Sequence, residues 1–189
     1  EWIDIGIKDC VYLILPMNHV FAFTCGFLGS VSGATSFSCA RSFRPNEILE
    51  DIKMTEVTIF LGVPLLFDKI LAGIDKKVEE KGVLTRSIVK TSFIASKFLK
   101  NVFNSRSGEK LFRSLREKAG MDKVRLFVSG GAPASKETIE RYNLMGFKFI
   151  QGYGLTETSP VVSLNFKGDY KIGSIGPALP TLEMKIENP

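Results

Sequence analysis

The sequence predicts an α/β fold with a mainly parallel sheet flanked by helices, and three observations support that prediction. Short apolar stretches alternate with segments of helical composition along most of the 189 residues. Residues 57–63 are mostly apolar at both odd and even positions, which is typical of a strand covered on both faces. Two glycine-rich turns each follow a predicted strand, at the end where open α/β sheets bind their ligands.

The first third of the chain alternates between strand and helix. Residues 12–15 are an apolar run that ends at Pro16, which indicates a buried strand. Residues 20–30 have helical composition, and residues 35–39 are again extended. Pro45 and Pro64 stand where the first turn of a helix tolerates proline, so we expect a helix behind each, with the strand 57–63 between them.

Residues 76–123 form a helical insert without a predicted strand. An apolar stripe can form there at helical spacing from Leu84, Ile88, Ala95, Phe98, Leu99 and Val102, with Lys90, Lys97 and Lys100 elsewhere on the helix. Two interpretations remain open. The helix docks on its own domain with its lysines in water, or it contacts an anionic membrane or a phosphorylated ligand.

The sheet pattern returns after residue 124. Residues 125–128 and 147–150 are predicted strands, and Ser135 can cap the helix between them. From residue 171 the glycines and prolines become frequent, and the alternating Leu182, Met184 and Ile186 suggest the start of an antiparallel element. We therefore expect an α/β unit over residues 1–170 and an incomplete β unit over residues 171–189.

Charge and cysteine content narrow the class of protein. Residues 76–125 hold 14 of the 25 basic residues but only five acidic ones, so the basic excess is regional. Three cysteines without metal or redox spacing fit a reducing compartment, and no leader peptide is recognisable, so a cytoplasmic location is expected, with peripheral membrane contact left open. Residues 10–40 lack charge, but Pro16, His19 and several glycines argue for buried strand and helix rather than a membrane span.

The two glycine-rich turns carry the candidate chemistry. Residues 129–133, SGGAP, expose backbone groups that a flat ligand can approach closely. In residues 151–158, QGYGLTET, the ring of Tyr153 can stack on a base, Thr156 offers a hydroxyl donor, and Glu157 offers a hard oxygen ligand for Mg²⁺. The alternative is an ordinary turn in which Glu157 is solvated and Tyr153 packs in the core.

Several segments in the same order resemble the adenylate-forming (AMP-binding) superfamily. QGYGLTET is similar to its signature, SGGAP to its adenine-contacting turn, LPMNHVF at 15–21 to its histidine segment, and KIGSIG at 171–176 with Pro180 to the stretch that follows. VPLLFDKI at 63–70 and the helical insert resemble long-chain fatty acyl-CoA synthetases in particular. The resemblance implies the fold of the central part of their large N-terminal domain.

The resemblance also implies roles for individual residues. Adenine would stack on Tyr153 and be lined by Gly131, Ala132 and Pro133, while Thr156 would bind the α-phosphate and Glu157 the Mg²⁺. His19 would lie by the substrate carboxylate or at the mouth of the acyl tunnel, although a core histidine is the alternative. Gln151, Gly152 and Gly154 would complete the nucleotide-binding segment, with both glycines keeping the pocket open.

The family's reaction implies the partners. A fatty acid carboxylate would attack the α-phosphorus of ATP to give acyl-adenylate and pyrophosphate, and the CoA thiolate would then displace AMP. Fatty acid, ATP and CoA are thus the expected substrates, and no nucleic acid is expected. The family's phosphate loop and C-terminal domain are not recognisable, so we expect the chain alone to be inactive. A ligase for medium-chain or aryl acids and a non-catalytic nucleotide- or lipid-surface-binding module remain alternatives.

Overall fold

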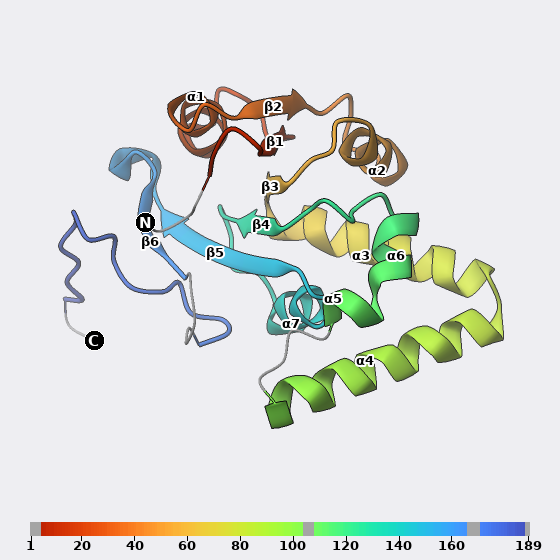
Figure 1. Ribbon diagram of the computed structural model, residues 1–189. Helices are drawn as coiled ribbons and strands as arrows, with labels where there is room; N and C mark the ends of the chain where they lie inside the picture. The colour runs from red at the N-terminus through yellow and green to blue at the C-terminus, as the bar shows by residue number, and fades with distance from the viewer. Residues whose placement is uncertain (1–4, 104–107, 166–170, 188–189) are drawn as a thin grey trace.

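A six-stranded sheet forms the centre of the computed structural model, which describes residues 5–103, 108–165 and 171–187 (Figure 1). The strand order is β2-β1-β3-β4-β5-β6, and every neighbouring pair is parallel except β5 and β6. This arrangement confirms the predicted fold class. The strand bounds are β1 Cys10–Leu13, β2 Ser36–Cys39, β3 Ile59–Gly62, β4 Leu126–Ser129, β5 Lys148–Gly154 and β6 Val161–Leu164.

Helices make the crossovers that parallel strands require. The π-helix η1 and the short α1 join β1 to β2, and α2 joins β2 to β3. Pro45 and Pro64 begin α2 and α3, as predicted, and Ser135 caps α7 by accepting a hydrogen bond of 3.0 Å from the Thr138 amide. The helix bounds are η1 Phe21–Leu28, α1 Gly29–Ser32, α2 Pro45–Met54, α3 Pro64–Glu80, α4 Val83–Phe103, α5 Gly108–Leu111, α6 Arg113–Lys118, α7 Lys136–Leu144 and the single 3₁₀ turn η2 Thr156–Thr158.

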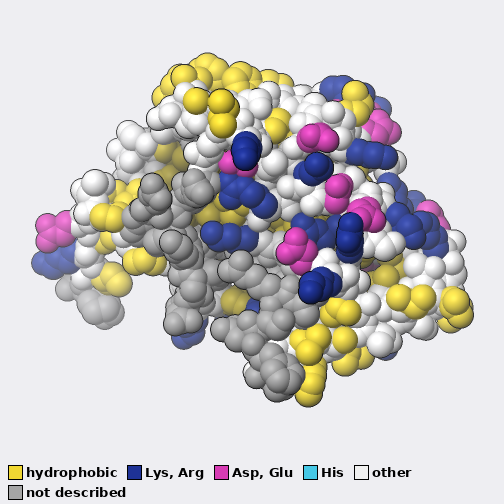
Figure 2. Space-filling view, viewed as in Figure 1, with side chains coloured by type: hydrophobic (Ala, Val, Ile, Leu, Met, Phe, Trp, Pro, Cys, Tyr) yellow, Lys and Arg dark blue, Asp and Glu magenta, His cyan; other side chains and the backbone are white. Residues whose placement is uncertain are grey.

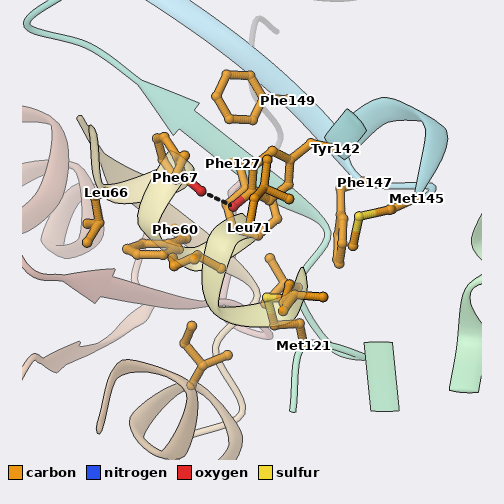
Figure 3. Close-up of a cluster of buried hydrophobic side chains, with 14 of the residues drawn as sticks. Phe60, Leu66, Phe67, Leu71, Met121, Phe127, Tyr142, Met145, Phe147 and Phe149 are labelled. Carbon is orange, nitrogen blue, oxygen red and sulfur yellow. Dashed lines mark hydrogen bonds between the residues drawn. The ribbon is translucent and has the colours of Figure 1, made fainter. Parts of the chain in front are cut away.

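One face of the sheet carries the larger core. Aromatic side chains from three strands, Phe60, Phe127 and Phe149, meet the α3 residue Phe67 with ring centroids 5.0 to 5.6 Å apart (Figure 3). Tyr142 of α7 is fully buried among them and donates a hydrogen bond of 3.1 Å to the Phe67 carbonyl. Helices α3 and α7 are therefore fixed to this face by packing and by one buried polar contact.

The opposite face is smaller and lies under η1. Because side chains alternate along a strand, Val11, Leu61 and Val128 point to this side, where they pack with Phe21. No helix among the described residues is long and apolar enough to cross a membrane. The uncharged stretch of residues 10–40 is instead β1, η1, α1 and β2, as the sequence predicts.

A charged cluster ties the strands together at the end of the sheet remote from the glycine-rich turns. Asp9, just before β1, accepts hydrogen bonds of 2.8 and 2.7 Å from the Arg125 guanidinium, just before β4. It also accepts one of 2.7 Å from the Thr58 hydroxyl, just before β3. These hydrogen bonds lower the pKa of Asp9 from 3.8 to about 2, with the contact to Arg125 having the largest effect.

The antiparallel element lies earlier in the chain than the hydrophobic alternation suggests. It is the β5–β6 pair, and one isolated bridge joins Ser163 to Ala178. Leu182, Met184 and Ile186 are exposed, and the described residues 171–187 contain no strand. Their alternation has no sheet to pack against here.

The helical insert docks through a different face of α4 from the stripe seen in the sequence. Phe93 packs on Phe112 with ring centroids 4.5 Å apart. The buried Ser96 hydroxyl donates a hydrogen bond of 2.7 Å to the Leu144 carbonyl at the end of α7. Leu84 and Phe98, which belong to the expected stripe, are 79% and 62% exposed. The side chain of Val102 lies outside the described residues.

Candidate functional site

The parallel pairing of β4 with β5 brings the two glycine-rich turns together. Ser129 and Gln151 are register partners, so the two glycine-rich segments begin side by side. The second segment differs from the prediction in its first half, because β5 continues through Gly152 and Tyr153 to Gly154 and pairs there with β6. A cavity of about 350 Å³ opens at this edge. It is lined by His19, Gly131, Gly152, Tyr153, Gly154, Thr156 and Glu157 among the predicted site residues.

The second turn folds back tightly on the end of β5. A Cβ on Gly154 would lie only 1.5 Å from the Pro160 carbonyl oxygen, so a side chain there is sterically excluded. The Thr158 hydroxyl accepts a hydrogen bond of 2.9 Å from the Leu155 amide and donates one of 2.8 Å to the Pro160 carbonyl. The role of Gly154 in this geometry is backbone contact within the turn, in addition to lining the cavity.

The tightened turn presents three polar or aromatic side chains to the cavity. Tyr153 is 43% exposed, so the interpretation of this ring as a core residue is wrong. Thr156 and Glu157 occupy the first two positions of η2, and both are exposed. A ring, a hydroxyl and a carboxylate within five residues thus line the exposed part of the cavity, which we call its mouth.

The first turn contributes backbone rather than side chains. Gly131 has a φ of +80°, a left-handed conformation that disfavours residues with a Cβ. Gly130 also lines the cavity, and a Cβ there would lie 3.1 Å from the Phe21 ring. Ala132 and Pro133 are exposed beside the cavity but do not line it.

Gln151 lies beneath the turns instead of in the cavity wall. It is 3% exposed, and its side-chain oxygen accepts a hydrogen bond of 2.9 Å from the Ala134 amide. The backbone amide of Gln151 donates a hydrogen bond to the side-chain oxygen of Asn165. The structure therefore places Gln151 between the two turns, where it can hold them together without meeting a ligand.

His19 is exposed, so the core-histidine alternative is wrong. It follows β1 and lines the same cavity as Tyr153 and Glu157. Its Nδ1 accepts a hydrogen bond of 3.2 Å from the Phe21 amide, which orients the ring and leaves Nε2 for another partner.

Apart from Ser30, the rest of the cavity wall is apolar, and its residues were not anticipated from the sequence. Val11, Ile59, Leu61 and Val128 line it from three strands, and Cys25 lines it from η1. Burial raises the pKa of the Cys25 thiol to about 11, so this side chain behaves as an apolar group at neutral pH. Strand alternation predicts that the four strand residues share a face, but it does not say which face is hollow.

The donor set at the cavity mouth suits Mg²⁺ held jointly with phosphates. Among the described residues that line the cavity, Glu157 supplies the single carboxylate, and it makes no ion pair with any of them. No group of three His, Cys, Asp or Glu side chains that could hold a metal occurs in the described part of the chain. Mg²⁺ commonly binds through one or two carboxylates with phosphate and water oxygens completing its shell.

Known proteins resemble this chain over nearly its whole length. The sequence profile described as "AMP-binding enzyme" matches residues 2–189. The peroxisomal long chain acyl-CoA synthetases 7 and 6 of Arabidopsis thaliana are 28% and 31% identical over 186 residues. Each alignment covers 95% of this chain but 26% of the relative, so the chain spans about a quarter of their length.

Solved structures share the fold. The Mycobacterium tuberculosis fatty acyl CoA synthetase has a TM-score of 0.63 at 24% identity, covering 94% of this chain and 28% of its own. Apo MatB from Rhodopseudomonas palustris has a TM-score of 0.63 at 23% identity, covering 93% of this chain and 27% of its own. The profile match over residues 2–189, on a fold with both glycine-rich turns at one cavity, shows that the chain belongs to the AMP-binding enzyme family.

Proposed function

We propose that this chain forms the adenylate- and acyl-binding part of an ATP-dependent, AMP-forming long-chain fatty acid–CoA ligase. The observation that carries the proposal is the composition of one cavity. Its mouth is lined by Tyr153, Thr156 and Glu157, and its wall by apolar strand residues such as Ile59 and Leu61. An acyl-adenylate has the matching chemistry, because a polar nucleotide is joined to a hydrocarbon chain.

The residues at the mouth support the nucleotide half of this assignment. The exposed ring of Tyr153 would stack on adenine beside Gly131, with Ala132 and Pro133 at the rim. Thr156 would donate a hydrogen bond to the α-phosphate, and Glu157 would hold Mg²⁺, which supplies charge neutralisation at the phosphates when bound. Gln151, Gly152 and Gly154 would support this binding by shaping the turn.

Both proposed chemical steps occur at the mouth. In the first, a carboxylate oxygen bonds to the α-phosphorus of ATP and pyrophosphate leaves with the bonding electrons. In the second, the CoA thiolate sulfur bonds to the acyl carbon and AMP leaves. His19, beside this mouth, would orient the carboxylate through Nε2, and Thr156 would offset charge on the phosphate.

The relatives' names support a long-chain acid as the substrate, and the apolar wall supports an acid with a hydrocarbon tail. We further propose that the 189-residue chain does not turn over by itself. The support is that the chain spans about a quarter of the relatives' length and lacks a recognisable phosphate loop. Sustained pyrophosphate release from ATP and palmitate by this chain would overturn that second statement.

Binding of a non-hydrolysable palmitoyl-adenylate analogue, measured by calorimetry beside AMP, tests the first statement. Tyr153→Ala should weaken both ligands. Cys25→Trp, which fills the apolar end, should weaken only the acylated one. Phe43→Ala, at a residue 62% exposed outside the cavity, is the control. Equal affinities for all four proteins would contradict the assignment, and tighter binding of octanoyl or benzoyl analogues would favour the medium-chain or aryl ligase.

A further inference from the structure

Helix α4 has two apolar faces, and one of them has no partner among the described residues. The docked face includes Val89, which packs against the larger core, and Phe93, which packs on Phe112 just before α6. It also includes Ser96, which donates a hydrogen bond to the Leu144 carbonyl at the end of α7. The other face carries Leu84, Ile88, Ile94 and Phe98, which are 79%, 60%, 64% and 62% exposed. Figure 1 shows α4 as the outermost helix on its side of the molecule, below α5 and α7.

The spacing groups these exposed side chains into two pairs within one third of the helix circumference. Leu84 and Ile88 are four residues apart, as are Ile94 and Phe98, and side chains at that spacing are neighbours on a helix surface. Figure 2 shows hydrophobic side chains along the lower edge of the molecule, where α4 lies in Figure 1. Isolated exposed apolar residues need no explanation, but a run along one helix marks an interaction surface.

The charges of the same helix indicate what covers it. The 21 residues of α4 include Arg86, Lys90, Lys97 and Lys100 but no Asp or Glu. Arg86, Lys90 and Lys97 are exposed, and at 100° per residue they lie on one flank of the apolar stripe. Glu79 and Glu80 stand in the preceding helix, next to Lys81.

From this geometry we propose that α4 is a membrane-docking helix for an anionic lipid surface. Leu84, Ile88, Ile94 and Phe98 enter the boundary between headgroups and acyl chains, while Arg86, Lys90 and Lys97 contact lipid phosphates. An exposed apolar face with a cationic flank is the combination that interfacial helices use. The docked face stays on the protein, so the helix does not have to leave its domain to bind.

A lipid surface fits this face better than a second copy of the chain. Two copies meeting through α4 would bring two cationic flanks together without an acidic residue from either helix to pair with them. A leaflet rich in phosphatidylglycerol or phosphatidylserine supplies the missing negative charge, and each nearby Lys or Arg then adds to the attraction.

Vesicle flotation of the 189-residue chain tests the proposal without nucleotide, so its outcome is independent of the proposed ligase function. The wild type should float with vesicles of phosphatidylcholine and phosphatidylglycerol. It should bind vesicles of pure phosphatidylcholine at least about tenfold more weakly. A triple variant with Leu84→Gln, Ile88→Gln and Phe98→Gln should reduce vesicle binding about tenfold or more. Glutamine is chosen because it has a high helix propensity. Lys90→Gln with Lys97→Gln should do the same at low salt, with a smaller effect at 1 M salt.

The matched control changes one apolar and one basic residue on α2, Met54→Ser with Lys53→Gln, both exposed. It should bind vesicles as the wild type does. Circular dichroism confirms that each variant is folded. No vesicle binding by the wild type, equal binding by the α4 variants, or a concentration-dependent dimer that the α4 substitutions abolish would each overturn the proposal.

Discussion

The side-chain oxygen of Gln151 lies 2.9 Å from the backbone nitrogen of Ala134 and accepts its hydrogen bond inside the protein. Gln151 is the last residue of β5 that pairs with β4, and its partner there is Ser129. Ala134 follows the first glycine-rich turn. The contact therefore joins the two turns that border the cavity. It gives Gln151 a positioning role behind the site.

Replacing Gln151 by Met should weaken both the fold and the site. Met has a similar length but no strong acceptor, so the buried Ala134 amide would lose its partner at a cost of about 1–3 kcal/mol. Urea unfolding measures that loss, and AMP titration measures the effect on the site. A variant with unchanged stability and unchanged AMP affinity would show that the contact has no positioning role.

Replacing Gly154 by Ala should disrupt the second turn. The new Cβ would overlap the Pro160 carbonyl, so the backbone of residues 154–160 must move, and we expect a loss of more than about 2 kcal/mol. Gly6→Ala is the control, because nothing lies within 4 Å of a Cβ there and the change should stay within about 0.5 kcal/mol. Similar unfolding midpoints for the two variants would contradict this steric account.

Ser129→Ala and Ser163→Ala should differ in their effect on stability, although both serines are fully buried. The Ser129 hydroxyl has no hydrogen-bond partner among the described residues, whereas the Ser163 hydroxyl donates a hydrogen bond of 3.1 Å to the Ile175 carbonyl. Removing the first should leave stability unchanged or raise it by up to about 1 kcal/mol, and removing the second should cost about 1 kcal/mol. Chemical denaturation of the pair tests this, and equal losses would contradict it.

The Asp9 carboxylate should make the fold sensitive to acid. Its pKa is lowered from 3.8 to about 2 by hydrogen bonds from Arg125, Thr58 and Gly6. Since the folded-state pKa is the lower one, the stabilisation is complete above about pH 4 and is lost as the pH falls through 2. A shift of this size corresponds to about 2 kcal/mol.

Asp9→Asn tests the acid dependence. The difference in unfolding free energy between wild type and variant should be largest at pH 7 and shrink between pH 4 and pH 2. Parallel stability curves for the two proteins over that interval would show that Asp9 does not titrate as described.

Local patterns in the sequence predicted most of the elements because their causes are local. Proline at a first helical turn, serine at an N-cap and apolar runs between glycines act over a few residues, so α2, α3, α7 and the five parallel strands all overlap the predicted segments. The bounds differ most for β1, which begins two residues earlier than predicted, and for β5, which continues to Gly154. The antiparallel strand β6 was missed, since its pairing with β5 depends on a chain reversal around residues 155–160 that hydrophobic alternation does not encode.

The candidate site divides in the same way. The sequence by itself determined that two glycine-rich turns follow neighbouring strands and that Tyr153, Thr156 and Glu157 stand in one of them. Only the tertiary structure decided which face of the sheet is hollow, that Gln151 lies behind the turns, and which face of α4 is docked. Those outcomes depend on partners far away in the chain, such as Ala134 for Gln151 and Leu144 for Ser96, and a local pattern carries no information about a distant partner.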